Sequence, residues 1–185
     1  MAGNVPKASQ VVVLAEDERH QMLVRRYLYR LGYSVHSLRL VELPSARGSG
    51  EQWVRDRYAK EVKAYRARSA RALTALVVVI DADTGDVTRR LRQLNESLDN
   101  AALAGRMIGE TIAHLIPKRS IETWILCLSD LNVDEINDYR DEAGIDERIP
   151  PAALKLFAWS RPGATISTHC VPSLLAAIPE VQRLT

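Results

Sequence analysis

Residues 76–83 read LVVVIDAD, and this stretch decides the fold of the 185-residue chain. An unbroken apolar run of this length is typical of a strand that is buried on both faces, as in a parallel sheet. A second run, VVVLA at residues 11–15, has the same character and is followed by Glu16-Asp17-Glu18. Segments with helical spacing of apolar residues separate the two runs. This alternation predicts an α/β fold, a three-layer Rossmann-like and mostly parallel sheet flanked by helices.

The remaining sequence predicts the other elements of this layered fold. Gly32 is expected to stop the first helix, Pro117 to stop the last strand, and residues 44–50 have the composition of a loop. We expect one domain over residues 1–185, with a helical C-terminal extension from about residue 130. The expected strands are residues 11–15, 33–43, 76–80 and 111–116, and the expected helices are about 22–31, 51–73, 87–104, 121–128, 152–159 and 171–184.

Composition narrows the class of protein. The chain is 46% hydrophobic and 26% charged, which is typical of a globular protein and not of a disordered one. No stretch of about 18 consecutive apolar residues is present, so we expect no membrane span. Two cysteines are too few for a disulfide scaffold, and they favour a reducing, cytoplasmic setting.

Charge is distributed unevenly along the chain. Thirteen Lys and Arg against four Asp and Glu lie between Arg19 and Arg71, a net charge of +9. Nine acids and one base, Arg140, lie between Glu122 and Glu147, a net charge of -8. Such polarity either creates one surface that attracts phosphates and another that repels them, or reflects two solvated helix faces.

Acidic residues follow both apolar runs, at the strand ends where open parallel sheets carry their active groups. Asp81 and Asp83 lie two residues apart, so the period of a strand is expected to point both side chains the same way. Carboxylate oxygens suit Mg²⁺ or Mn²⁺, so Glu16, Asp81 and Asp83 together predict a metal site. Acids after strands also cap the next helix, and we favour this interpretation for Glu18 and Asp86.

These strand ends resemble a known family. Residues 11–16, VVVLAE, and 77–83, VVVIDAD, are similar to the TOPRIM domain of topoisomerases, primases and OLD-type nucleases. Residues 116–126, IPKRSIETWIL, and 170–174, CVPSL, resemble segments of small stand-alone TOPRIM-like proteins. The resemblance spans most of the chain, although its individual motifs are short.

The resemblance implies roles for particular residues. Glu16 matches the TOPRIM glutamate, which acts in acid-base chemistry or holds a metal, while Asp81 and Asp83 match residues that bind Mg²⁺. Glu122 matches an additional ligand or orienting carboxylate. Lys118, just after a predicted strand end, either stabilises charge on a pentavalent phosphate or simply covers the edge of the sheet.

Two positions depart from the family pattern. Asp17 stands where TOPRIM nucleases commonly have glycine, and His20 stands where OLD-type enzymes often have a second acid. His20 is either a metal ligand or base, or a surface histidine on the first helix, and we favour the surface interpretation. These departures bear on a two-metal mechanism more than on the fold.

The helix expected at 51–73 is strongly basic. Lys60, Lys63, Arg68 and Arg71 are candidates for tracking a phosphate backbone, which makes nucleic acid an expected partner. Its aromatic residues share the spacing of an apolar stripe, so we expect them in the core and not as platforms for base stacking. These are Trp53, Tyr58 and Tyr65.

Two classes of function follow. The first is an Mg²⁺- or Mn²⁺-dependent phosphodiesterase, a nuclease acting on DNA or RNA. The resemblance implies an ATPase partner protein in anti-phage defence, and a homo-oligomer stays open. The second is a module that binds a partner or nucleic acid without cleavage, either an inactive TOPRIM-like domain or a receiver domain with Asp81 as phosphoacceptor. The receiver is disfavoured because the Met-Pro and Lys-Pro usual in that family do not appear at the expected places.

Overall fold

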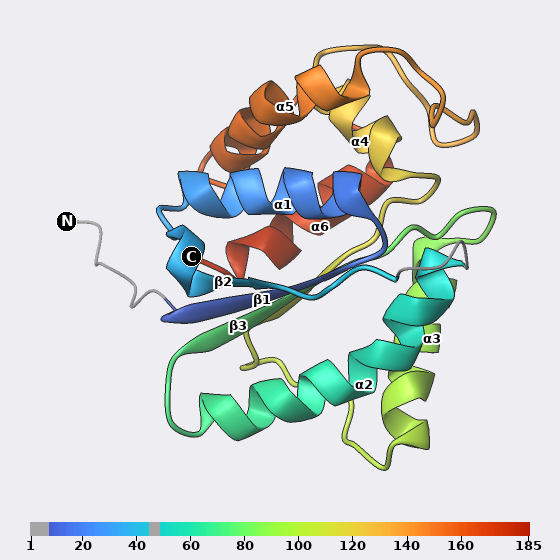
Figure 1. Ribbon diagram of the computed structural model, residues 1–185. Coiled ribbons are helices and arrows are strands. Elements are labelled where there is room, and N and C mark those ends of the chain that lie inside the picture. Colours follow the sequence, from blue (N-terminus) through green and yellow to red (C-terminus); the bar gives the residue numbers. More distant parts are fainter. Residues whose placement is uncertain (1–7, 45–48) are drawn as a thin grey trace.

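The computed structural model describes residues 8–44 and 49–185, and the part of the predicted 44–50 loop at residues 45–48 lies outside them. Within these two ranges, four strands form one parallel sheet in the order β2-β1-β3-β4 (Figure 1). The strands are β1 (Gln10–Ala15), β2 (Leu38–Leu40), β3 (Thr74–Val79) and β4 (Ile112–Leu115).

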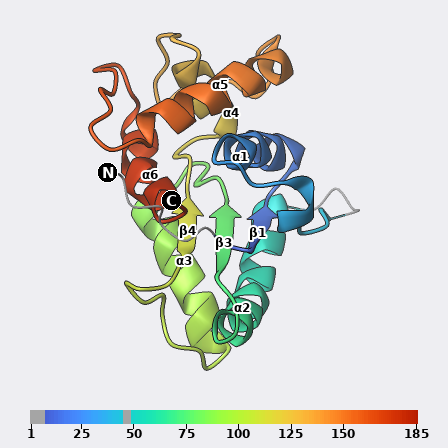
Figure 2. The same ribbon diagram turned by 90° about the vertical axis from the view of Figure 1, so that its left-hand side faces the viewer.

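Within the described residues, six helices flank the sheet (Figures 1 and 2). One side carries α1 (Glu18–Arg30), α4 (Ile121–Leu128), α5 (Ile145–Trp159) and α6 (Pro172–Gln182), and the other carries α2 (Gly50–Ser69) and α3 (Val87–Asn100). Of these, α5 packs on α1 and α4 and not on the sheet itself. The predicted fold class, a three-layer α/β arrangement around a parallel sheet, is confirmed. Among these helices, none is both long and apolar enough to cross a membrane in the part of the chain that the structure describes.

The apolar runs form strands because both faces of the sheet are buried. Val11 and Val13 of β1 pack into the core beneath α1, while Val12 and Leu14 pack into the core beneath α2. All four side chains are fully buried. A strand with one face in solvent alternates polar and apolar residues. A strand whose two faces are both covered by helices is apolar throughout, as β1 and β3 are after their first residue.

The strand order places a topological switch point between β1 and β3. The chain leaves β1 through α1 to reach β2 on one side, and then returns through α2 to β3 on the other side. In open parallel sheets, ligands bind outside the carboxyl ends of the strands at such a point. The acids that follow β1 and β3 therefore lie where a ligand site is expected.

The second predicted strand, residues 33–43, is wrong in extent. The structure has a 3₁₀ turn at Val35–Ser37 and then only three strand residues, Leu38–Leu40, which pair with Val11–Val13. Val35 is 63% exposed and does not join the sheet. β2 lies at the edge of the sheet and pairs only with β1, and edge strands in native proteins are often very short.

The C-terminal helices share the core of the sheet. The predicted helix at 152–159 begins earlier, at Ile145, with Pro150 and Pro151 inside it. Proline removes helical hydrogen bonds, but burial of Ile145 and Ile149 one turn apart offsets that loss. Farther along, Trp124 of α4 donates its indole N–H to the Ser173 hydroxyl of α6 at 2.8 Å, which joins the two helices.

Candidate metal centre

Three side chains converge at the switch point: Glu16, His20 and Asp81. One potential ligand atom from each lies within 4.8 Å of the other two. β1 and β3 pair with Ala15 opposite Val79, so the residues just beyond the two strands are neighbours. The backbone N–H of Asp81 donates to Glu16 Oε2 at 3.0 Å, which fixes the glutamate across this gap.

His20 comes from the first turn of α1, and Asp17 is the N-cap that positions it. The Asp17 Oδ1 atom accepts from the backbone N–H of His20 at 3.1 Å and lies 2.7 Å from its Nδ1. On the other side of the ring, Nε2 lies 2.9 Å from Asp81 Oδ1. The imidazole is fully buried between the two carboxylates. The expectation of a surface histidine is therefore wrong, because the capping turn directs His20 inward.

The buried charges shift one another's proton affinities. Burial opposes charge on His20, but the Asp81 carboxylate and the hydrogen bond to Asp17 raise the pKa of His20 well above its usual value. Burial and repulsion by Asp81 raise the pKa of Glu16 to about 7. Although burial acts in the opposite direction, contact with His20 lowers the pKa of Asp17 to about 2. Burial thus favours the neutral form of Glu16, while the carboxylates of Asp81 and Asp17 favour the charged form of His20.

Asp83 lies beside this group but does not follow the strand. β3 ends at Val79, and Asp83 has a left-handed backbone with φ of 55°, in the turn before α3. The expected extended strand through Asp81 and Asp83 is therefore wrong, although both carboxylates face the same guanidinium, that of Arg140. Asp83 contacts two arginines, with Arg140 Nη2 at 2.5 Å and Arg90 Nη2 at 3.5 Å.

The other predicted site residues lie at the same edge of the sheet. Glu122 is buried on α4, and its Oε1 accepts from Arg19 Nη1 at 2.9 Å. Lys118 is half-buried just after β4, and its backbone N–H donates to Ser173 Oγ at 3.2 Å. Glu122 lies on a cleft of about 650 Å³ whose lining residues are Asp17, Glu18, Arg19, Met22, Glu122, Arg140 and Asp146.

Capping accounts for other acids near the site. Asp86 is the N-cap of α3, and its Oδ1 accepts from the backbone N–H of Arg89 at 2.6 Å, as predicted. On α1 the capping side chain is Asp17, and Glu18 is the first helical residue. The negative charge of Glu18 still favours the N-terminal end of the helix dipole.

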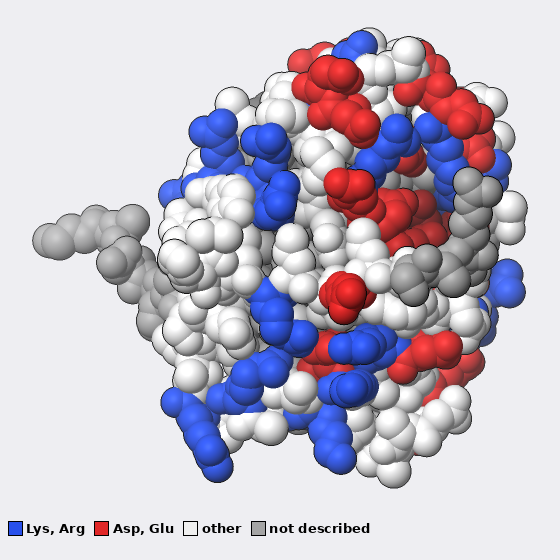
Figure 3. All heavy atoms as spheres, viewed as in Figure 1, with Lys and Arg blue, Asp and Glu red and all other residues white. Residues whose placement is uncertain are grey.

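The basic residues of α2 extend away from this centre. α2 begins at Gly50, next to Glu16, and it ends at Ser69, before Leu73, whose carbonyl accepts from the Ser9 N–H at the amino ends of the central strands. Twenty helical residues span about 30 Å, so Arg68 and Arg71 lie far from the acids. In Figure 3, Lys and Arg gather over that far end, while many acids gather where the strands end.

The candidate cations lie on α2 and, for Arg71, in the turn just after it, whereas the aromatic residues of α2 face the core. Lys60, Lys63 and Arg71 are exposed and Arg68 is half-buried, and none of the four has an ion pair within the described residues. Tyr58 and Tyr65 are buried in the core, as expected, and Trp53 packs against it half-buried. These cations without ion pairs remain the candidates for contact with phosphate.

The arginines of the site, with Arg90 among them, were not predicted. Arg19 joins Glu122 to Asp146 of α5, and Arg140 joins Asp83 to Asp81. Both contacts are made between segments distant in the sequence, so no local periodicity indicates them. The one available signal was that Arg140 is the only base in an acidic stretch of 26 residues, from Glu122 to Glu147.

The fold and the site define a class, a parallel three-layer α/β protein with carboxylates and a histidine at its switch point. Comparison with protein-family models, with curated proteins and with solved structures finds no match to this chain. Any assignment of activity therefore depends on the geometry of the site.

Proposed function

We propose that this protein is a divalent-metal-dependent phosphodiesterase that cleaves DNA or RNA. The observation that carries the proposal is the convergence of Glu16 and Asp81 on the switch point, where the Glu16 carboxylate binds the backbone of Asp81. Groups that perturb one another's pKa in this way, at the ligand-binding edge of a sheet, are candidates for a functional site. The TOPRIM resemblance supports the same pair of residues.

The donor set fits a divalent cation. Glu16 and Asp81 offer carboxylate oxygens, and His20 can offer Nε2 once a bound cation displaces the ring proton that it now shares with Asp81. Burial and the neighbouring Asp81 carboxylate raise the pKa of Glu16, and a bound cation would favour its ionised form. Oxygen ligands suit Mg²⁺, and the additional imidazole favours Mn²⁺. A cation bound here would supply Lewis-acid activation of water and of a phosphate.

The protein's own residues would orient the reacting groups. Asp17 holds His20 through Nδ1, which leaves Nε2 directed at Asp81. Lys118 lies beyond β4 at the same edge, a position from which its ammonium can approach the charge that develops on a phosphate. Glu122, held by Arg19, would act as an orienting carboxylate in the cleft.

A polymeric substrate accounts for the charge on α2. Lys60, Lys63 and Arg68 provide cations along a helix that starts beside Glu16, and Arg71 follows in the turn after it. A nucleic-acid strand that follows α2 would place one of its phosphates at the carboxylates. An ATPase partner and a role in anti-phage defence are proposed from the family resemblance alone.

The test is Asp81→Asn, which keeps the shape of the side chain and removes one charge from the ligand set. We expect loss of Mg²⁺- or Mn²⁺-dependent cleavage of labelled single- and double-stranded DNA and RNA, with the fold retained by circular dichroism. Asp99→Asn, on the exposed end of α3, is the matched control and should cleave normally. Undiminished cleavage by Asp81→Asn would overturn the proposal.

A receiver-like module is the second candidate, favoured by the strand order. The order β2-β1-β3-β4 matches the first four strands of the flavodoxin-like order, with Asp81 after β3 and acids after β1. However, Asp81 is 3% exposed, with His20 at one oxygen and Arg140 near the other. Labelling of Asp81 by acetyl phosphate, together with an absence of cleavage by the wild type, would favour this candidate.

A further inference from the structure

Arg140 places a cation between Asp81 and Asp83. Its Nη2 atom lies 2.5 Å from Asp83 Oδ1, 3.4 Å from the carbonyl oxygen of Arg119 and 3.7 Å from Asp81 Oδ2. Two carboxylates and one carbonyl thus surround a single positively charged nitrogen. This is the oxygen environment that a hard divalent cation prefers.

The backbone of Arg140 has hydrogen bonds of its own, separate from the contacts of its guanidinium with Asp81 and Asp83. Its carbonyl oxygen accepts from Arg19 Nη1 at 3.1 Å, and its N–H donates to Asp138 Oδ1 at 3.1 Å. The guanidinium also lies 3.5 Å from Asp138 Oδ2. The side chain is 43% exposed and lies on the 650 Å³ cleft. The guanidinium can therefore leave the carboxylates while the loop stays docked on α1.

We propose that Arg140 is a built-in counter-ion of this centre, displaced from Asp81 and Asp83 by a divalent cation and then free to bind a substrate phosphate in the cleft. The inference rests on the proposed function, because it assigns a substrate contact to the same site. When Arg140 leaves, the Asp83 carboxylate becomes available as a metal ligand. Arg90 stays in contact with Asp83.

Charge and shape support both positions of the side chain. A guanidinium does not lose its proton in a protein, so it cannot share these carboxylates with a dication without strong repulsion. Its planar fork suits the two oxygens of a phosphate as well as those of a carboxylate. Divalent cation and phosphate should therefore bind cooperatively, because each favours the same position of Arg140.

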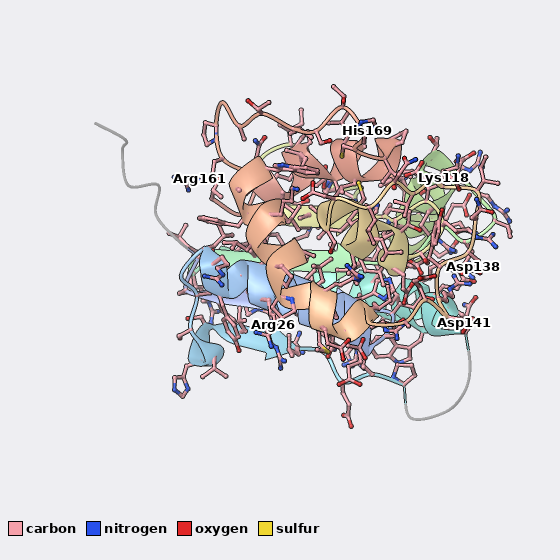
Figure 4. All side chains as sticks on the ribbon, turned by 90° about the horizontal axis from the view of Figure 1, so that it is seen from above. Arg26, Lys118, Asp138, Asp141, Arg161 and His169 are labelled. Carbon is pink, nitrogen blue, oxygen red and sulfur yellow. The ribbon has the colours of Figure 1, made fainter. Side chains whose placement is uncertain are left out.

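The test is Mn²⁺ binding by isothermal titration calorimetry, which needs no cleavage. Arg140→Gln removes the competing charge, and we expect it to bind Mn²⁺ about threefold to fivefold more tightly than the wild type. Arg140→Lys keeps a competing charge and should stay close to the wild type. Arg161→Gln is the charge-matched control. Figure 4 shows Arg161 at the opposite end of the molecule from Asp138 and Asp141, which flank Arg140 in the sequence.

A second titration includes a deoxythymidine dinucleotide, whose single phosphodiester is the phosphate probe. It should tighten Mn²⁺ binding more in the wild type than in Arg140→Gln or Arg140→Lys. Tighter Mn²⁺ binding by Arg140→Gln without any cleavage by the wild type would sink the proposed function and keep this inference. Equal or weaker Mn²⁺ binding by Arg140→Gln, or no Mn²⁺ binding by the wild type, would overturn it.

Discussion

The charge state of the centre depends on two residues, Glu16 and His20. Burial raises the pKa of Glu16. Burial alone would lower the pKa of His20, but the neighbouring carboxylates of Asp81 and Asp17 raise it. His20 lies between two carboxylates and holds its proton, whereas Glu16 faces Asp81 and gains one more readily. The acids were predicted because they follow apolar runs. The burial of His20 was not, because a histidine in the first turn of a helix has no sequence signal for the side it faces.

Glu16→Gln is expected to change how stability depends on pH. The pKa of Glu16 is about 7 when folded and 4.5 in its ordinary state, so the folded protein binds this proton more tightly. Stability therefore falls as the pH rises from 4.5 to 7, by up to about 3 kcal/mol. Glutamine cannot titrate and still offers an oxygen to the Asp81 N–H.

The measurement is urea unfolding in EDTA at acid and alkaline pH. The variant should match the wild type near the acid end of this range and be more stable above it. Glu96→Gln, an exposed position on α3, should show no such divergence. A constant difference between Glu16→Gln and the wild type across the range would contradict the assigned pKa.

At the scale of elements, α2 links the centre to the basic surface. Its first residue, Gly50, lies against Glu16, and a Cβ added there would come within 2.6 Å of Glu16 Cγ and 2.7 Å of the Glu16 carbonyl oxygen. The helix can approach the end of β1 only because residue 50 lacks a side chain. The sequence assigned this glycine to a loop, and the close contact appears only in the structure.

Gly50→Ala is expected to destabilise the fold by about 1–3 kcal/mol, because the new methyl group overpacks this contact. It should also weaken Mn²⁺ binding, since Glu16 has to move. Chemical denaturation and calorimetry measure the two effects. Gly109→Ala is the control, because a Cβ there meets no atom within 4 Å. Equal effects of the two substitutions would show that the contact at Gly50 is not tight.

The cations on and just after α2 give a second prediction at this scale. Replacing Lys60, Lys63 and Arg71 with Glu should weaken nucleic-acid binding to all sequences alike, and the salt slope should fall by about 0.9 for each phosphate that the helix no longer neutralises. Fluorescence anisotropy at several salt concentrations measures both. Arg26→Glu with Arg161→Glu, exposed and on the other helical layer, should have little effect. Unchanged binding would make these cations an ordinary solvated face.

At the scale of the whole molecule, one buried cluster joins the sheet to α5 and α6. Leu156 of α5 and Val181 of α6 lie in the same cluster as Val77 of β3. Within the described residues, α5 packs on α1 and α4, and α6 packs on β4, so both C-terminal helices belong to the core on one side of the sheet. We expect the chain to unfold as one unit.

Leu156→Ala should destabilise the molecule by about 2–5 kcal/mol, because it leaves a cavity in this cluster. Far-ultraviolet circular dichroism and tryptophan fluorescence should still report one coincident transition. Leu154→Ala, two residues away but 46% exposed, is the control and should cost little. Two separate transitions would show that α5 and α6 unfold independently of the sheet.

The sequence by itself determined the layered α/β architecture, the two central strands and the acids that follow them. Apolar runs and helical spacing are both patterns that are local in the sequence. A strand buried on two faces is an unbroken apolar run, and a helix with one buried face repeats its apolar residues every three or four positions. Only the tertiary structure decided that β1 lies beside β3, that His20 is buried and that Arg140 reaches Asp83. Those contacts join residues 57 to 65 positions apart, and packing of the whole chain decides which distant groups meet.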